Sequence, residues 1–288
     1  MQVTVHAPAK INITLDIVGT RADGYHLLES LFQSVSIYDT VVAKKAAAGV
    51  ISLQIEGDGC DCPVEKNTAY KAAKVFFEAT GIEGGVHLTL TKRIPQQAGM
   101  GGGSADAAGV LWALNRLFNT RLTVGQLCEI GLTVGADVPF CVLGGTAFVT
   151  GIGEGLQPLP PLPDCYIVVA QPDEGISTKE AYAAVDNATI TRRPDNAAAI
   201  AALQADDLSA VCRQAVNVFE VATELESVAA IRRKMEAYAP LCSQMTGSGS
   251  CVFAIFTDRD SAEECQLDLQ QDYNTAFVCQ PCNGIVEE

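Results

Sequence analysis

The sequence lacks any apolar run long enough to cross a membrane. The stretch YIVVA at 166–170 is far shorter than the roughly 20 apolar residues that a spanning helix needs. The first ten residues, MQVTVHAPAK, lack the basic start and apolar block of a secretory signal. The 288 residues are 48% hydrophobic and 18% charged, a composition that can bury a core. We therefore expect a soluble, cytoplasmic protein that does not bind membranes.

Histidine is scarce, and its few positions offer no metal cluster. His6, His26 and His87 are isolated from one another. The chain has 11 cysteines, but its only close pairs, CDC at 60–62 and CQPC at 279–282, do not resemble a zinc knuckle. The first spacing is also too tight. We predict no metal held by a cluster of side chains, and thiols that stay free in a reducing compartment.

Positive charge is in deficit, with 19 Lys and Arg against 34 Asp and Glu and a net charge of −15. A field of this sign disfavours nucleic acid and anionic membranes as partners. An anionic small molecule would have to be held by locally placed cations or backbone N–H groups. The composition does not decide between a monomer and a weak homodimer.

Strand and helix patterns are interspersed without a regular βαβ order, which predicts an α+β fold. Residues 3–17 alternate, as a strand pair or as one strand bent at Pro8. Four prolines between 158 and 163 are typical of a connection, so we expect domains at 1–157 and 158–288. Helical patterns cover 67–81, 104–118, 123–134, 178–186, 196–215 and 225–238.

A glycine-rich loop, QQAGMGGGSADAAG, follows an alternating strand that ends at Pro95 and precedes a helix. Backbone N–H groups and a helix N-terminus attract anions at such a point. The chain contains no Gly-Lys pair, which excludes a P-loop, and Ser104 stands where a dinucleotide fingerprint needs its third glycine. From the loop alone, a phosphate cradle and a tight packing turn both remain open. Ser104 can cap the helix, and Asp106 can hold a cation.

Three further features lie elsewhere in the chain. MTGSGSC at 245–251 is a second Gly/Ser loop, and GADVPF at 135–140 places Asp137 as a helix N-cap. Lys10 lies among aliphatic residues of a strand, where it should point outward unless it has a partner. Each feature alone has an ordinary structural explanation, but together they indicate a functional site.

These segments resemble the GHMP kinase superfamily, whose members carry a Pro-x-x-x-Gly-Leu-Gly-Ser-Ser type of loop. PQQAGMGGGSA at 95–105 has that role here, with GADVPF and TGSGSCVFA (246–254) in the expected order. The motif RADGYH at 21–26 is not shared by the superfamily at large and makes the chain most similar to its cytidyl-diphosphate branch. The resemblance implies a ribosomal-S5-domain-2-like N-terminal domain and a ferredoxin-like C-terminal α/β sandwich, with the active site in the cleft between them.

The resemblance also implies a reaction. That branch uses ATP, with Mg²⁺, to phosphorylate the 2-hydroxyl of 4-diphosphocytidyl-2-C-methyl-D-erythritol in the non-mevalonate route to isoprenoid precursors. Lys10 and Asp137 would be the catalytic pair. The residues implied to bind ATP are Asn67, Pro95, Gln96, Gln97, Ala98, Gly99, Met100, Gly101, Gly102, Gly103, Ser104 and Ala105. Those implied to bind the cytidine diphosphate alcohol are Asn12, Tyr25, His26, Phe32, Thr178, Tyr182, Gly247 and Ser248.

The match has departures, and it leaves two other functions to consider. Ala105 stands where a second serine is more usual, Met100 replaces leucine, and Asp106 stands where asparagine also occurs. A homoserine or sugar kinase of the same superfamily is the main alternative, although RADGYH argues against it. A non-catalytic nucleotide sensor should have lost Lys10 or Asp137, and both are present.

Overall fold

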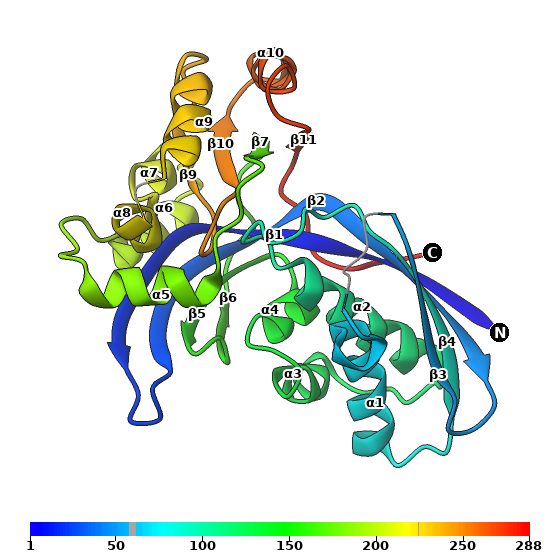
Figure 1. Cartoon of the computed structure of the whole chain (residues 1–288). Coiled ribbons are helices and arrows are strands. Elements are labelled where there is room, and N and C mark those ends of the chain that lie inside the picture. Colours follow the sequence, from blue (N-terminus) through cyan, green and yellow to red (C-terminus); the bar gives the residue numbers. More distant parts are fainter. Residues whose placement is uncertain (58–61, 224) are drawn as a thin grey trace.

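The computed structural model describes residues 1–57, 62–223 and 225–288, and its elements form two sheets with helices packed against each (Figure 1). Cys60, one member of the CDC pair, lies outside these residues. The arrangement confirms the predicted α+β class. In the described part of the chain, no helix is both long and apolar enough to span a membrane.

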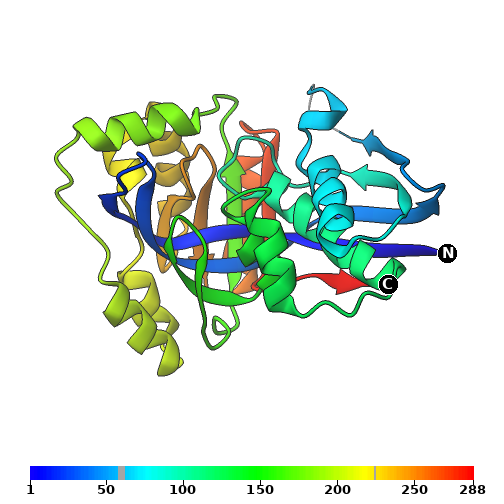
Figure 2. The ribbon, with the colours of Figure 1, turned by 90° about the horizontal axis from the view of Figure 1, so that it is seen from below.

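The larger sheet has the strand order β12-β1-β2-β4-β3. Three further strands join it: β5 pairs with β2, β6 pairs with β5, and β8 pairs with β1. Figure 2 shows its two long strands crossing most of the molecule. Its strands are β1 (Gln2–Thr20), β2 (His26–Ala46), β3 (Ile51–Glu56), β4 (Gly85–Thr91), β5 (Thr146–Gly151), β6 (Gly155–Pro158), β8 (Val216–Asn217) and β12 (Val286–Glu287). Helices α1 (Thr68–Thr80), α2 (Gly102–Leu117) and α4 (Val138–Leu143) contact its strands, while η1 (Val64–Lys66) packs on α1, and α3 (Val124–Leu132) packs on α1, α2 and α4.

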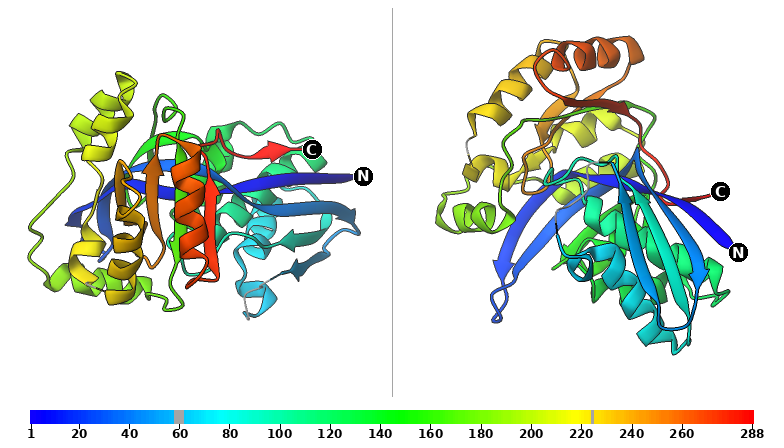
Figure 3. Two further views of the ribbon diagram at one scale, coloured as in Figure 1. Left: turned by 90° about the horizontal axis from the view of Figure 1, so that it is seen from above. Right: turned by 45° about the vertical axis from the view of Figure 1, so that its right-hand side comes forward.

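The smaller sheet has the order β11-β7-β10-β9 and is antiparallel throughout. Helices α9 and α10 lie together over it (Figure 3). Its strands are β7 (Tyr166–Gln171), β9 (Cys242–Met245), β10 (Val252–Phe256) and β11 (Thr275–Cys279). The helices that contact these strands are α9 (Glu226–Glu236) and α10 (Arg259–Leu269). Helices α6 (Asn196–Gln204) and α8 (Val218–Thr223) instead contact β2 and β1 of the larger sheet, with α7 (Leu208–Arg213) against α6 and α5 (Thr178–Asn187) against α8. The division at 157/158 stays a prediction, and β8 and β12, from beyond it, join the larger sheet.

The sequence allowed either a strand pair or one strand bent at Pro8, and the structure has one continuous strand, β1. Its pairing with β2 shifts register between Pro8 and Ala9. From Ala7 to Ile17 every residue is buried, because α2 and α4 contact the strand and polar groups of the C-terminal half cover it as well. The polar members of this run are therefore buried too, and each needs a hydrogen-bonding partner.

Two predicted helix boundaries were wrong, each for a local reason. The single helix expected over 196–215 is two helices, because Asp206 adopts a left-handed φ of 57° and Asp207 caps α7 by accepting the N–H of Ala210. Helix α2 begins at Gly102 rather than Ser104, and its N-cap is Gly101, with φ 71°. Ser104 therefore does not cap the helix.

Helix α2 carries much of the core against the larger sheet, and this yields a stability prediction. Leu111 of α2 is fully buried, whereas Leu267 of α10 is 62% exposed. We expect Leu111→Ala to lower the free energy of unfolding by about 2–5 kcal/mol, because it leaves a cavity. The control Leu267→Ala should change it by no more than about 0.5 kcal/mol. Urea denaturation followed by circular dichroism measures both, and equal midpoints would contradict the assignment of α2 to the core.

Candidate active site

The glycine-rich loop joins β4 to α2 and lies against both halves of the molecule. Gly99 has a φ of 71°, and a Cβ added there would lie 2.1 Å from the carbonyl oxygen of Thr246. A Cβ on Gly101, also at φ 71°, would lie 3.0 Å from the Lys10 side chain. Only glycine allows these approaches. The loop is further fixed by Lys10, whose backbone N–H donates to the carbonyl of Met100 at 3.0 Å.

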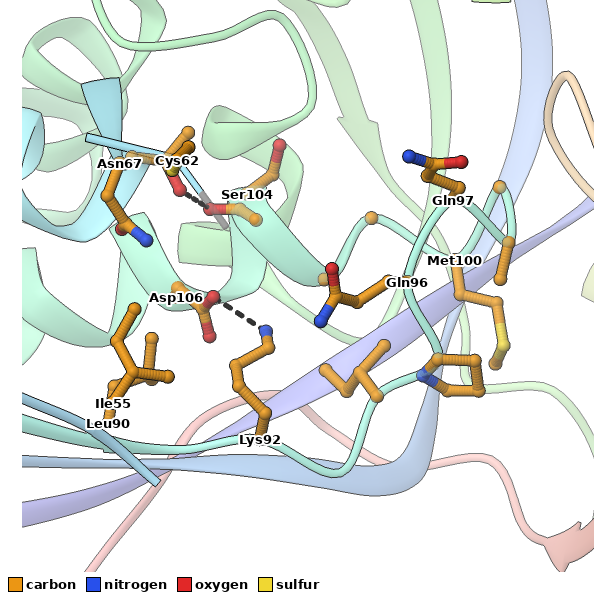
Figure 4. A pocket seen from close by; sticks show the side chains of 18 of the residues that line it. Ile55, Cys62, Asn67, Leu90, Lys92, Gln96, Gln97, Met100, Ser104 and Asp106 are labelled. Carbon is orange, nitrogen blue, oxygen red and sulfur yellow. Dashed lines mark hydrogen bonds and ion pairs between the residues drawn. The ribbon is translucent and has the colours of Figure 1, made fainter. Parts of the chain in front are cut away.

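A first cavity, of about 380 Å³, lies under this loop and the start of α2 (Figure 4). Its other walls come from η1, the start of α1, and the apolar side chains of Ile55 and Leu90. Ala105 is fully buried and is not among the lining residues. The other residues that the sequence assigned to ATP all line the cavity: Asn67, Pro95, Gln96, Gln97, Ala98, Gly99, Met100, Gly101, Gly102, Gly103 and Ser104.

A second cavity, of about 690 Å³, lies on the other side of the same loop. Gln97, Gly99 and Gly101 line both cavities, so the loop is a wall that the two share. The predicted site residues that line this second cavity are Lys10, Asn12, Phe32, Asp137, Thr178, Tyr182, Gly247 and Ser248. Tyr25 and His26 do not line it, and Tyr25 is 61% exposed.

Lys10 and Asp137 lie together in the second cavity. Lys10 does not point into solvent, because its face of β1 is covered; it is 4% exposed. Its Nζ donates to Asn12 Oδ1 at 2.7 Å, lies 3.6 Å from Asp137 Oδ2 and sits 4.8 Å from the centroid of the Phe32 ring. Asp137 precedes α4 as its N-cap residue, but its side chain makes no capping hydrogen bond. The carboxylate is therefore directed to Lys10 instead.

Asn12 connects this pair to the second glycine loop. Its backbone N–H donates to Thr246 Oγ1 at 3.0 Å, and its side-chain amide donates to Ser30 Oγ at 2.9 Å. Asn217 fixes the same loop by donating to the carbonyls of Met245 and Gly247, each at 2.8 Å. Sequence reasoning missed Thr246 and Asn217. A buried amide within the apolar run AVNVF was the signal for Asn217.

An aromatic cluster closes one side of the second cavity. Tyr182 of α5 meets Phe219 of α8 edge-on, with centroids 4.8 Å apart, and lies 4.6 Å from the His26 ring. Burial, with a further contribution from Asp137, raises the pKa of the Tyr182 hydroxyl. His26 Nε2 is 2.7 Å from Asp186 Oδ1, which orients the imidazole. Phe219 was not foreseen, because nothing in its local sequence distinguishes it from a core residue.

Asp106 has a partner that the sequence did not reveal. The cation it meets is the ammonium of Lys92, whose Nζ lies 2.7 Å from Asp106 Oδ2 (Figure 4). The same ammonium also contacts Asp39. All three side chains are almost completely buried. Among the described residues, no group of three or more His, Cys, Asp and Glu side chains is arranged to hold a metal ion.

Comparison with known proteins identifies the relatives of this chain. The family model of the GHMP kinases N terminal domain matches residues 67–145, and that of the GHMP kinases C terminal domain matches residues 192–275. A 4-diphosphocytidyl-2-C-methyl-D-erythritol kinase from Clostridium tetani is 41% identical over 277 residues, which is 95% of this chain and 98% of that protein.

Solved structures agree with these matches. A crystal structure of 4-(cytidine 5'-diphospho)-2C-methyl-D-erythritol kinase superposes with a TM-score of 0.81 at 33% identity, covering 99% of this chain and 100% of that one. A homoserine kinase from Cytophaga hutchinsonii superposes with a TM-score of 0.80 at 21% identity, covering 100% of this chain and 97% of that one. This match shows a shared fold. By these matches the chain is an enzyme of the GHMP kinase superfamily and belongs to its 4-diphosphocytidyl-2-C-methyl-D-erythritol kinase family.

Proposed function

We propose that this enzyme transfers the γ-phosphoryl group of ATP to the 2-hydroxyl of 4-diphosphocytidyl-2-C-methyl-D-erythritol, giving the 2-phosphate and ADP. One observation carries the proposal: two cavities share the glycine loop as a common wall, and Lys10 and Asp137 lie beside that wall. A phosphate donor in one cavity and an alcohol in the other would meet at the loop.

The first cavity suits ATP. The loop and the N-terminus of α2 present backbone N–H groups, and the macrodipole of α2 favours anions at that end. Ile55 and Leu90 give the opposite end an apolar floor suited to a flat base. The phosphates would then lie along Gly99–Gly103, next to the second cavity. This arrangement lets an acidic protein bind an anionic ligand through local groups.

The second cavity suits a cytidine diphosphate alcohol. Tyr182, with Phe219 behind it, offers a ring on which a pyrimidine base can stack. Thr178 and Ser248, whose hydroxyl oxygens are 3.2 Å apart, also line the cavity and can hydrogen-bond a diphosphate. In this assignment Tyr25 and His26 flank the base from outside the cavity, with His26 acting through its contact with Tyr182.

Phosphoryl transfer needs positioning and charge stabilisation more than covalent chemistry by the protein. Asp137 would accept the proton of the attacking hydroxyl. Lys10 would orient the Asp137 carboxylate and offset the negative charge that develops on the transferred group. Asn12 would fix Lys10 through their 2.7 Å hydrogen bond. Lys10 and Asn12 are buried, whereas the Asp137 side chain is 32% exposed and can be reached by a hydroxyl group in the second cavity.

Mg²⁺ belongs to this proposal as the usual companion of ATP. Magnesium in such sites is held by one or two protein oxygens together with the phosphates, so a separate cluster of acidic residues is not required. The Ser104 hydroxyl lines the nucleotide cavity and is the protein group that would join the phosphates around the ion. When bound, Mg²⁺ shields the charge of the phosphates during transfer.

A homoserine or sugar kinase is the alternative. The full-length relatives at 36–41% identity bear the cytidyl-diphosphate name, whereas the homoserine kinase shares only the fold at 21% identity. The ring cluster around Tyr182 also suits a base better than an amino acid or sugar. We place the reaction in the cytoplasmic, non-mevalonate route to isoprenoid precursors.

A coupled assay for ADP release tests the proposed reaction. The proposal would be refuted if adding the cytidine diphosphate alcohol released no ADP above the background measured with ATP alone.

The role of Asp137 leads to the first catalytic prediction. Asp137→Asn keeps the shape of the side chain but cannot take a proton, so kcat should fall by about 10²–10⁴ or more. ATP binding, measured by calorimetry, should stay nearly unchanged, because Asp137 does not line the nucleotide cavity. The control Asp272→Asn, at a surface ion pair with Lys234, should retain wild-type kcat. Full turnover by Asp137→Asn would show that another group is the base.

The aromatic cluster around Tyr182 leads to a second prediction, which concerns substrate affinity. Loss of one base-stacking ring costs about 1–3 kcal/mol, so Tyr182→Ala should raise KM for the cytidine substrate by about 5- to 150-fold. Tyr182→Phe keeps the ring and should restore most of that affinity. KM for ATP should not change in either variant, because Tyr182 lines only the second cavity. If Tyr182→Ala weakens ATP and the alcohol alike, the cytidine assignment of this cavity is wrong.

A further inference from the structure

The second glycine loop, at residues 245–251, lies between two cavities. Gly247, Ser248 and Gly249 line the second cavity, whereas Asn217 does not. Asn217 lines a third cavity, of about 710 Å³, whose walls come from β8, β9 and the helices α7, α8 and α9. Neither Gly247 nor Ser248 lines this third cavity. Asn217 therefore contacts the loop from outside the cavity that we assign to the cytidine substrate.

Asn217 is buried, and both of its donors go to this loop. It is 2% exposed, and its Nδ2 donates to the carbonyl oxygens of Met245 and Gly247, each at 2.8 Å. Its Oδ1 accepts the backbone N–H of Phe219 at 3.0 Å. Only one orientation of the amide matches these partners, because carbonyl oxygens accept and N–H groups donate.

The segment that carries Asn217 is itself well anchored. Strand β8 pairs in parallel with β1, so the position of Asn217 is set by the long strand of the larger sheet. Glu220, three residues further along, accepts the backbone N–H of Met245 through Oε2 at 2.8 Å. Residues 216–220 thus hold three backbone groups of the loop, and such an anchor can keep a peptide unit in one orientation.

The hydrogen bond to the Gly247 carbonyl also fixes the direction of the next N–H group. In a planar trans peptide unit, the C=O and N–H bonds point in opposite directions. Because the Gly247 carbonyl points to Asn217, the N–H of Ser248 points away from it, to the side of the second cavity. Within the described chain, no protein group accepts this N–H. Gly247 permits the arrangement with a φ of 56°, a value that favours glycine.

Backbone donors matter in the second cavity because side-chain cations are scarce there. Of the described residues that line it, Lys10 is the only lysine or arginine, and the carboxylates of Asp137 and Glu180 line it as well. The Lys10 ammonium already donates to Asn12 and lies beside Asp137. A diphosphate in this cavity must therefore be bound largely by uncharged donors, and free N–H groups of a loop supply them.

We propose that Asn217 is a positioning residue for the diphosphate of the substrate: it holds the peptide unit between Gly247 and Ser248 so that the Ser248 N–H donates to a phosphate oxygen. That this cavity takes a cytidine diphosphate alcohol rests on the function proposed above. If the peptide unit turned over, the Gly247 carbonyl would face the phosphate, and an acceptor would meet an anion. The orientation of this one peptide unit therefore decides between attraction and repulsion.

Asn217→Asp tests the proposal with a change of one group, because it keeps Oδ1 for Phe219 and puts an oxygen that repels both carbonyls in place of Nδ2. Calorimetric titration of the full-length enzyme with cytidine and with cytidine 5'-diphosphate, at pH 8.5, measures how much the diphosphate adds to binding. Kd for cytidine 5'-diphosphate should rise about 10- to 100-fold, the cost of losing a hydrogen bond to a charged group. Kd for cytidine should stay nearly unchanged.

The pH dependence of the same variant separates a lost donor from a general distortion of the loop. Burial beside two carbonyls favours the neutral form of the introduced carboxyl group, and in that form its O–H can donate to one of them. The ratio of variant to wild-type Kd for cytidine 5'-diphosphate should therefore be smaller at pH 5.5 than at pH 8.5. A distorted loop would give the same ratio at both pH values, which would contradict the proposal.

Asn196→Asp is the matched control. Asn196 is also a buried amide that contacts β1, where its Oδ1 accepts the hydroxyl of Thr14 at 2.6 Å, and it lines none of the three cavities. This variant should bind cytidine 5'-diphosphate as the wild type does at both pH values. Binding of a non-hydrolysable ATP analogue in the first cavity should be nearly unchanged in both variants and reports that they are folded.

A second variant covers the case in which Asn217→Asp does not fold. Asn217→Ala removes both donors without adding a charge, and it should raise Kd for cytidine 5'-diphosphate about two- to tenfold, with little change for cytidine. In the kinase assay, KM for the cytidine diphosphate alcohol should rise while kcat stays close to the wild-type value, because the lost contact serves binding and not the transfer step.

Three results would overturn the proposal. In the first, a folded Asn217 variant binds cytidine 5'-diphosphate as tightly as the wild type. In the second, the variant weakens cytidine and cytidine 5'-diphosphate equally. In the third, the wild type binds cytidine 5'-diphosphate no more tightly than cytidine, which would also remove the diphosphate from this cavity. A failed kinase assay with intact binding of cytidine 5'-diphosphate would instead refute only the proposed reaction.

Discussion

The site depends on the burial of polar groups along β1 between the two halves of the chain. Asn12 is held by Thr246, Thr14 donates to Asn196, and Asp16 pairs with Arg193. Buried polar groups are costly unless they are hydrogen-bonded, so these partners are needed where the C-terminal half meets the strand. Lys10 belongs to the same run, and its ammonium is kept in place by Asn12. The contacts that join the halves therefore also position the proposed catalytic lysine.

The glycine loop uses the same junction in a different way. Gly99 approaches the backbone of Thr246 so closely that no side chain fits between them. The first glycine loop thus rests against the second, and two of the three residues that line both cavities, Gly99 and Gly101, are glycines. Asn217 secures the second loop from behind through the carbonyls of Met245 and Gly247.

The negative net charge of the chain does not prevent it from binding an anion, because the groups that line the cavity determine the local electrostatic potential. The chain carries a net charge of −15, yet the first cavity, which we propose binds ATP, presents backbone N–H groups, a helix N-terminus and the ammonium of Lys92. Both acids of the Lys92 cluster lie against its ammonium group, and burial raises the pKa of Asp106. The net charge therefore affects the solubility of the protein and disfavours binding to nucleic acid, but it has much less effect on a ligand inside the cavity.

The sequence by itself determined the α+β class, most helices and the loop that lines both cavities, because these follow from periodicity and from glycines at required positions. Its resemblance to the GHMP kinases predicted Lys10 and Asp137 as the catalytic pair, and their side chains lie 3.6 Å apart in the structure.

The tertiary structure alone decided which residues surround this pair and the two cavities. Thr246, Asn217, Phe219 and Lys92 are distant in sequence from the groups they contact, and no local pattern encodes such pairs. Asp106 looked like a cation ligand at a helix start, and only burial beside Lys92 and Asp39 changed its chemistry, because desolvation and neighbouring charge arise from the folded environment.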